Sequence, residues 1–228
     1  MKRLKLIWIE WRSFFVFIAL MFVFRSAIAD WYEVPTGSMK PTIIEGDRVF
    51  VNKLAYDLKI PFTLVTIASW GNPVRGDVIV FDSLKENKRL IKRVIGEPND
   101  VIEMVNNQVY INSLPAVYSD TDQSLVEKYW DNLNSFTRVK PILYKEHYGN
   151  NEYLITVLKQ GSNQINNQAR NFGPYQVPEN KYFVLGDNRD NSADSRFIGA
   201  IDRKYILGQA NKIVFSTRQA ERFFLSLN

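Results

Sequence analysis

Three short stretches of the sequence carry side chains that could do chemistry together. The first, PTGSMKPT, places Ser38 among glycine and proline residues. Such residues force a tight, irregular backbone that can present a hydroxyl and neighbouring amides to a ligand. The same pattern is typical of a simple turn. Taken alone, Ser38 is therefore either a nucleophile or a structural turn residue.

The second stretch, RLIKRVIG (residues 89–96), places a lysine inside an aliphatic run. If these residues form a strand, Leu90, Lys92 and Val94 share one face, because side chains alternate along a strand. Burial there would lower the pKa of Lys92 toward neutrality. A lysine of that kind can accept a proton from a serine hydroxyl. The alternative is that Lys92 and Arg93 are solvated charges at a sheet edge.

The third stretch, GDNRDNSADSR (residues 186–196), is densely polar and follows an apolar run. It could be a calcium loop, because Asp187, Asp190 and Asp194 offer oxygen ligands. The spacing departs from the EF-hand pattern, however, and two arginines would neutralise the site. The second interpretation is a loop whose own carboxylates and guanidinium groups pair with one another and thereby position a hydroxyl such as Ser192.

The composition narrows the chemistry further. The sequence has no cysteine and one histidine, His147, so thiolate nucleophiles, disulfides and thiolate metal sites are excluded. His147 lies in a poorly patterned segment and is expected to be an exposed loop residue. The net charge is +5, but the basic residues are scattered, which argues against nucleic-acid binding. Serine activated by lysine is the arrangement that remains.

Together the stretches resemble those of the bacterial type I signal peptidases (leader peptidases), a peptidase family with a Ser-Lys dyad. The order along the chain agrees: PTGSMKPT, GDRVFVNK, RGDVIVF, KRVIGEPND and GDNRDNSADSR. The resemblance spans residues 30–112 and 175–215 and leaves the segment between them uncovered.

The resemblance implies a membrane-bound serine endopeptidase that removes signal peptides from exported preproteins after small-x-small (Ala-x-Ala) sites. It implies Ser38 as nucleophile and Lys92 as general base, without a cofactor or a metal. Thr36, at a position that is usually serine in this family, would join the Ser38 amide in the oxyanion hole. Two alternatives remain open: a dedicated Ser-Lys maturation peptidase (conjugation or organellar), and a non-catalytic membrane-tethered peptide-binding β-domain.

The resemblance also implies supporting roles for the third stretch. Ser192 would orient the catalytic lysine, Asp194 and Arg196 would pair to hold the loop, and Gly186 would permit its close approach.

The substrate would bind as an added strand, with shallow pockets for small side chains. Met39 would lie beside the catalytic centre, exclude water and contribute to the substrate pocket. Ile60 and Phe62, within the apolar run 60–65, would line the substrate pocket or touch the lipid surface; ordinary core packing is the alternative for this run.

The elements that must position these residues read as short strands. Runs rich in Val, Ile, Phe and Tyr, bounded by Gly, Asp, Asn and Pro, predict a mostly β, antiparallel sheet domain. Residues 101–114 predict a hairpin that turns at Asn106-Asn107. Residues 118–171 form a more polar insertion, with a strand at 152–158 and a loop at 160–173.

The N-terminal segment carries an uncharged apolar run, residues 13–24. A membrane span needs about 20 apolar residues. Residues 13–29 reach the lower limit, with Arg25 extending toward the interface and Trp31 and Tyr32 forming an aromatic belt. A cleavable signal peptide is the rival interpretation, because Ala27-Ile28-Ala29 resembles a cleavage site.

The family resemblance favours a retained anchor. We then expect residues 1–12 in the cytoplasm, 13–29 as a single span of the inner (cytoplasmic) membrane, and 30–228 as a peptidase domain on the periplasmic or outer side. The expected partners are preproteins emerging from the secretion machinery and membrane lipid. Self-cleavage after Ala29 is a further hypothesis.

Overall fold

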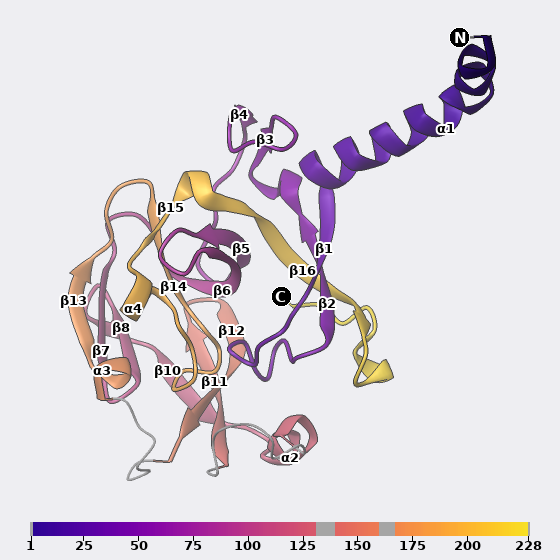
Figure 1. Ribbon diagram of the computed structural model, residues 1–228. Coiled ribbons are helices and arrows are strands. Elements are labelled where there is room, and N and C mark those ends of the chain that lie inside the picture. The colour runs from indigo at the N-terminus through magenta and orange to yellow at the C-terminus, as the bar shows by residue number, and fades with distance from the viewer. Residues whose placement is uncertain (1, 131–139, 160–166, 228) are drawn as a thin grey trace.

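The computed structural model describes residues 2–130, 140–159 and 167–227. A long helix, α1 (Lys2–Ala27), leads into a body built mainly of antiparallel strands (Figure 1). The predicted mostly-β, antiparallel fold is confirmed.

The largest sheet has seven strands and draws on both ends of the chain. All of its strand pairs are antiparallel. In spatial order the strands are β1 (Ala29–Glu33), β2 (Asp47–Asn52), β16 (Ile206–Ser216), β5 (Val78–Ser83), β6 (Lys88–Gly96), β14 (Lys181–Leu185) and β15 (Ile201–Asp202). The segment that joins β1 to β2 carries Ser38, and β6 carries Lys92.

A four-stranded sheet contains the predicted hairpin. Its order is β13 (Phe172–Gln176), β7 (Val101–Val105), β8 (Gln108–Ile111) and β9 (Leu114–Pro115). Asn106 and Asn107 form the turn with φ of 51° and 68°. Asparagine tolerates these left-handed angles, which match the twist of the flanking strands. The predicted hairpin is confirmed.

The polar insertion forms a sheet of its own. Its strands are β10 (Val117–Asp120), β11 (Pro141–Tyr148) and β12 (Asn151–Leu158), with α2 (Ser124–Trp130) between the first two. The strand expected at 152–158 is confirmed. Of the loop expected at 160–173, residues 160–166 lie outside the described residues. The rest is wrong as a loop, because α3 (Asn167–Arg170) and the start of β13 occupy it, and β13 finds its backbone partners in distant β7.

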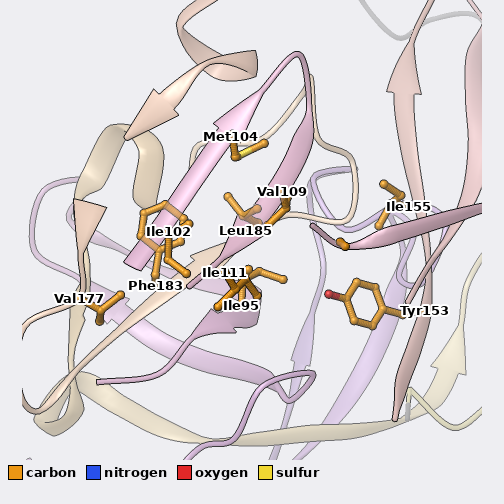
Figure 2. Packing of buried hydrophobic residues seen from close by; sticks show 11 residues of the cluster. Ile95, Ile102, Met104, Val109, Ile111, Tyr153, Ile155, Val177, Phe183 and Leu185 are labelled. Atoms are coloured by element: carbon orange, nitrogen blue, oxygen red, sulfur yellow. The ribbon is translucent and has the colours of Figure 1, made fainter. Parts of the chain in front are cut away.

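Three buried clusters form the core. The first joins the seven-stranded sheet to the hairpin and to β12, and Figure 2 shows Phe183 and Leu185 among Ile95, Ile102 and Ile155. The second lies beneath the segment that carries Ser38 and includes Val34, Met39 and Ile43. The third lies around Ile79, Phe81 and Val184. Burial of each such side chain contributes about 1.5–3 kcal/mol.

Helix α1 extends away from the strand body (Figure 1). Phe14 to Phe17 and Leu20 to Phe24 are exposed. At 3.6 residues per turn, these runs cover every side of the helix. Among the residues that the structure describes, no helix meets the combined length and hydropathy required of a membrane span.

The short hairpin β3 (Asp57–Lys59) and β4 (Thr66–Ser69) lies next to the end of α1 (Figure 1). Register explains this position: Ala29, the first residue of β1, pairs with Asn52, the last of β2, and β3 follows β2 closely. The segment with Ser38 therefore leaves the sheet at the other end of β1 and β2.

Candidate active site

The structure brings Ser38 and Lys92 together across 54 residues of sequence. Lys92 Nζ lies 2.7 Å from Ser38 Oγ and donates to the carbonyl of Ile91 at 2.8 Å. One amine therefore contacts a hydroxyl on an irregular segment and is held in place by its own strand. A hydroxyl and an amine at this distance can exchange a proton.

Burial sets the chemistry of this amine. Lys92 is only 2% exposed to solvent. Desolvation disfavours the charged form and lowers the pKa of Lys92 to about 8, although the carboxylates of Asp194 and Asp187 oppose the shift. The alternative that Lys92 and Arg93 are solvated edge charges is wrong, because both residues are buried.

Two contacts from the third stretch hold the Ser38 segment. The backbone N–H of Asn188 donates to the Ser38 carbonyl at 3.1 Å, and its side-chain amide donates to the Gly37 carbonyl at 3.0 Å. Sequence reasoning gave Asn188 no role. The one feature of the sequence that could have indicated a role for Asn188 is its position inside the polar stretch 186–196.

Lys40 is a second residue that sequence reasoning missed. It is 7% exposed and pairs with Glu45 at 2.9 Å, and its Nζ lies 5.2 Å from the ring centre of Trp130 in α2. The contact between Lys40 and Trp130 links the segment after Ser38 to the insertion.

The space around Gly186 is too small for a residue with a side chain. A Cβ atom at this position would collide with the carbonyl oxygen of Ser38 and with the side chain of Ser192. The absence of a side chain at Gly186 thus lets the polar stretch pack directly on the segment that carries Ser38. Ser192 Oγ is buried and has no hydrogen-bond partner among the described residues. The hydrogen bonds of Lys92 go to Ser38 and Ile91 instead.

Asp194 and Arg196 form the expected pair at the start of α4 (Ser195–Ile198). Their charged groups are 2.7 Å apart, and both side chains are fully buried. Asp194 also accepts the backbone N–H of Gly186 at 3.0 Å. The pair therefore fixes the loop on both sides of Ser192.

The other charged residues of the loop find partners elsewhere, so the expectation of a loop paired only within itself is wrong. Asp187 binds Arg93 of β6 at 2.8 Å, and Arg93 follows Lys92 in the sequence. Asp190 binds Arg170 of α3 at 2.7 Å. Guanidinium groups thus occupy these carboxylates, and the described residues contain no group of three or more His, Asp or Glu that could hold a metal ion.

Of the partners that the loop finds outside itself, the most deeply buried, Glu146, comes from the insertion. Arg189 lies 2.7 Å from Glu146 of β11, and the two side chains are 0% and 1% exposed. Burial alone would raise the pKa of Glu146, but the Arg189 guanidinium outweighs it and holds this pKa below its ordinary value. Strand β11 of the insertion is thereby part of the support of the site, which sequence reasoning did not find.

The remaining predicted site residues fall in different places. Thr36 is exposed on the segment that carries Ser38, two residues before it. Met39, which was expected to contribute to the substrate pocket, is 1% exposed and packs in the second core cluster. Ile60 and Phe62 lie between β3 and β4, at the opposite end of β1 from Ser38. The structure does not bring these two residues to Ser38.

His147 lies in β11, not in a loop, so that expectation is wrong. Its Nε2 is 2.9 Å from Ser119 Oγ and its Nδ1 is 3.4 Å from Glu152. The histidine contacts Ser119, whereas the side chain that contacts Ser38 is Lys92.

The Ala27-Ile28-Ala29 sequence lies at the junction of α1 and β1. Ala27 and Ala29 are 7% and 8% exposed, and the Ile28 carbonyl accepts the N–H of Lys53 at 2.9 Å. In this conformation the bond after Ala29 is not presented as a substrate strand.

A serine hydroxyl held against a buried lysine amine in a β-sheet domain is the arrangement that a serine hydrolase with a lysine base requires. A family model described as "Signal peptidase, peptidase S26" matches residues 7–215, including the insertion. Signal peptidase I of Buchnera aphidicola subsp. Schizaphis graminum is 34% identical over 92% of this chain and 75% of its own. Signal peptidase I of Pseudomonas aeruginosa is 34% identical over 87% of this chain and 69% of its own.

A solved structure of a signal peptidase I from Enterococcus faecalis is 25% identical, with a TM-score of 0.36, covering 62% of this chain and 98% of that chain. On the family model and the relatives, the chain belongs to the signal peptidase family, peptidase S26, and is a serine endopeptidase. The alternative of a non-catalytic binding domain is overturned.

Proposed function

We propose that this enzyme removes signal peptides from exported preproteins after small-x-small sites, with Ser38 as nucleophile and Lys92 as general base. The observation that carries the proposal is the 2.7 Å contact between Ser38 Oγ and a lysine amine that is 2% exposed. The relatives named signal peptidase I support the substrate class.

The first half of the reaction follows from this contact. Neutral Lys92 takes the hydroxyl proton as Ser38 Oγ bonds to the scissile carbonyl carbon. The negative charge on the carbonyl oxygen is stabilised by the Ser38 N–H and the Thr36 hydroxyl. The carbon–nitrogen bond then breaks, and the leaving amine takes the proton from Lys92. The signal peptide remains as an ester on Ser38.

In the second half, Lys92 takes a proton from a water molecule that attacks the ester carbon. The ester bond breaks, Ser38 Oγ regains a proton from Lys92, and the signal peptide leaves with a free carboxylate. With a pKa of about 8, roughly one tenth of Lys92 is neutral at pH 7, which is enough to act as a base.

The polar stretch is proposed to position this base. Ser192 Oγ, buried and without a described partner, is available to bond the Lys92 amine once Ser38 is acylated. The buried Asp194–Arg196 pair and the close packing at Gly186 support Ser192 in that position.

We also propose a membrane location, with residues 13–29 as anchor, residues 1–12 in the cytoplasm and residues 30–228 on the periplasmic or outer side. The all-round apolar exposure of α1 supports the anchor. The neighbouring β3–β4 segment supports it too, because Phe62, Val65, Ile67 and Trp70 are all more than half exposed. Preproteins and membrane lipid are the partners that follow.

The test uses full-length protein in detergent with a preprotein that carries an Ala-x-Ala site. Wild type is expected to cut after the second alanine, whereas Ser38→Ala and Lys92→Ala are expected to be inactive. Ser119→Ala and Lys88→Ala are matched controls: the first removes the hydroxyl beside His147, and the second removes an exposed lysine of the same strand.

Cleavage by Ser38→Ala, or loss of cleavage in Ser119→Ala alone, would refute the assignment of the nucleophile. Processing of a single member of a preprotein panel would instead identify a dedicated maturation peptidase. Extraction of the protein from membranes by alkaline carbonate would refute the anchor.

A further inference from the structure

A cavity of about 420 Å³ opens where α1 meets the strand body. It lies at the other end of β1 from Ser38, so it is separate from the proposed active site. Its walls combine cationic, hydroxyl and apolar side chains: Ser26, Ala27, Lys53, Lys59, Phe62, Thr63, Leu64, Asp82, Arg89 and Leu207.

Two of the cations in the wall are fixed by backbone carbonyls. Lys53 Nζ donates to the carbonyls of Arg25 and Ser26 at 2.8 and 3.1 Å, which holds the C-terminal end of α1. Lys59 Nζ donates to the carbonyl of Ile206 at 2.7 Å. These bonds keep both ammonium groups at the cavity at fixed positions.

Positive charge exceeds negative charge around this cavity. Asp82 is balanced by Arg89 at 2.9 Å. Each of the two other carboxylates is shared between two cations. The members of the cluster are Arg25, Lys53, Lys59, Arg89 and Arg203 with Asp30, Asp57 and Asp82. Two positive charges therefore have no counter-charge of their own within this cluster.

The attraction of the shared carboxylates does not offset the cost of burying the two charged lysines. Desolvation lowers the pKa of Lys53 despite the opposing charge of Asp30, and it lowers the pKa of Lys59 despite Asp57. An anion that entered the cavity would offset this desolvation.

The apolar part of the wall continues into the exposed surface that faces α1. Phe62 is 72% exposed, and its N–H donates to Ser26 Oγ at 2.6 Å, which ties the β3–β4 segment to the helix end. Leu64 is also exposed, at 39%. A ligand that suits this wall has an anionic group next to hydrocarbon.

We propose that this cavity binds the phosphate of an anionic phospholipid, with Lys53, Lys59 and Arg89 around the phosphate and Phe62 and Leu64 against the glycerol and acyl chains. The inference rests on the proposed membrane location. Free phosphate shares the charge but leaves the apolar wall unused, so the lipid is the occupant. Bound lipid fixes the junction of α1 with the strand body, and with it the height of Ser38 above the bilayer.

The experiment titrates full-length protein in non-ionic detergent with dihexanoyl-phosphatidylglycerol, dihexanoyl-phosphatidylcholine or inorganic phosphate, and follows tryptophan fluorescence. Trp31 packs under Arg25 and Trp70 lies in the β3–β4 region, so both report on the junction. Saturable binding of phosphatidylglycerol alone is expected.

Arg89→Gln removes one cation from the cavity wall. It is expected to weaken phosphatidylglycerol binding about fivefold, the effect of one basic residue at an anionic lipid surface. Arg48→Gln is the matched control, because Arg48 pairs with Glu33 at 3.5 Å at the far end of β1. Binding by this control should equal that of wild type, and thermal unfolding checks that both variants fold.

Three results would overturn the inference: no saturable binding of phosphatidylglycerol, equal weakening in Arg48→Gln, or inorganic phosphate binding as tightly as the lipid. Preprotein cleavage is measured on the same samples. Cleavage without lipid binding sinks this inference alone, and lipid binding without cleavage sinks the proposed reaction alone.

Discussion

Replacing Lys92 by methionine is expected to abolish cleavage and to stabilise the folded protein at neutral pH. Methionine has a similar length and carries no charge, so it removes the buried ammonium without leaving a large cavity. The variant also loses the two hydrogen bonds of the amine, to Ser38 Oγ and the Ile91 carbonyl. Each lost bond costs about 0.5–1.5 kcal/mol, and this cost does not depend on the charge of residue 92.

The ionisation contribution does depend on pH. The pKa of Lys92 is about 8 in the folded protein against an ordinary 10.5. The unfolded chain therefore binds more protons between these values, and wild-type stability rises with pH through this window. Below pH 8 the folded wild type carries the whole cost, about 3 kcal/mol at about 1.4 kcal/mol per pH unit. At pH 10 most of this free-energy cost has disappeared, because Lys92 is then neutral in the folded protein.

Urea unfolding at pH 7 and pH 10 measures this effect. The stability of Lys92→Met relative to wild type should fall by about 2.5 kcal/mol between the two pH values. Lys204→Met removes an exposed ammonium group and reports how much of any change comes from overall charge. A stability difference between Lys92→Met and wild type that is the same at both pH values would refute the argument that Lys92 is desolvated.

Three further outcomes are expected. Wild-type kcat/KM should rise about tenfold per pH unit below pH 8 and level off above it, because only neutral Lys92 accepts the Ser38 proton; a flat profile from pH 6 to 9 would contradict this. Glu146→Gln should cost about 3–5 kcal/mol in urea unfolding, because Arg189 stays buried without its partner, whereas Glu146→Leu combined with Arg189→Met should cost less. Gly186→Ala should cost about 1–3 kcal/mol and slow cleavage, because the added methyl meets the Ser38 carbonyl; full activity would show that the loop can retreat.

The sequence by itself determined the antiparallel β class. Through the resemblance of its motifs to the type I signal peptidases, it also indicated the two residues at the centre of the proposed reaction, whereas local rules described only the backbone and strand face on which each of them lies. Turn residues around Ser38 predict an irregular backbone, and alternation along a strand predicts that Lys92 shares a face with Leu90 and Val94. The hairpin turn at Asn106-Asn107 is equally local, because its angles depend on the residues in the turn.

Tertiary structure alone decided which charges from distant parts of the sequence support the site. Glu146 and Arg189 are 43 residues apart, and the chain has 24 acidic and 29 basic side chains. Nothing local distinguishes the pair that becomes buried from the many that stay at the surface. The burial of Met39 and the separation of Phe62 from Ser38 likewise depend on tertiary contacts that the local sequence does not reveal.

The physical reason is the range of each interaction. Backbone preferences and side-chain alternation act over a few residues and can be read from the chain. Desolvation, ion pairing and close packing depend on which segments meet. The pKa of Lys92, the partner of Arg189 and the cavity beneath α1 exist only once the strands are assembled.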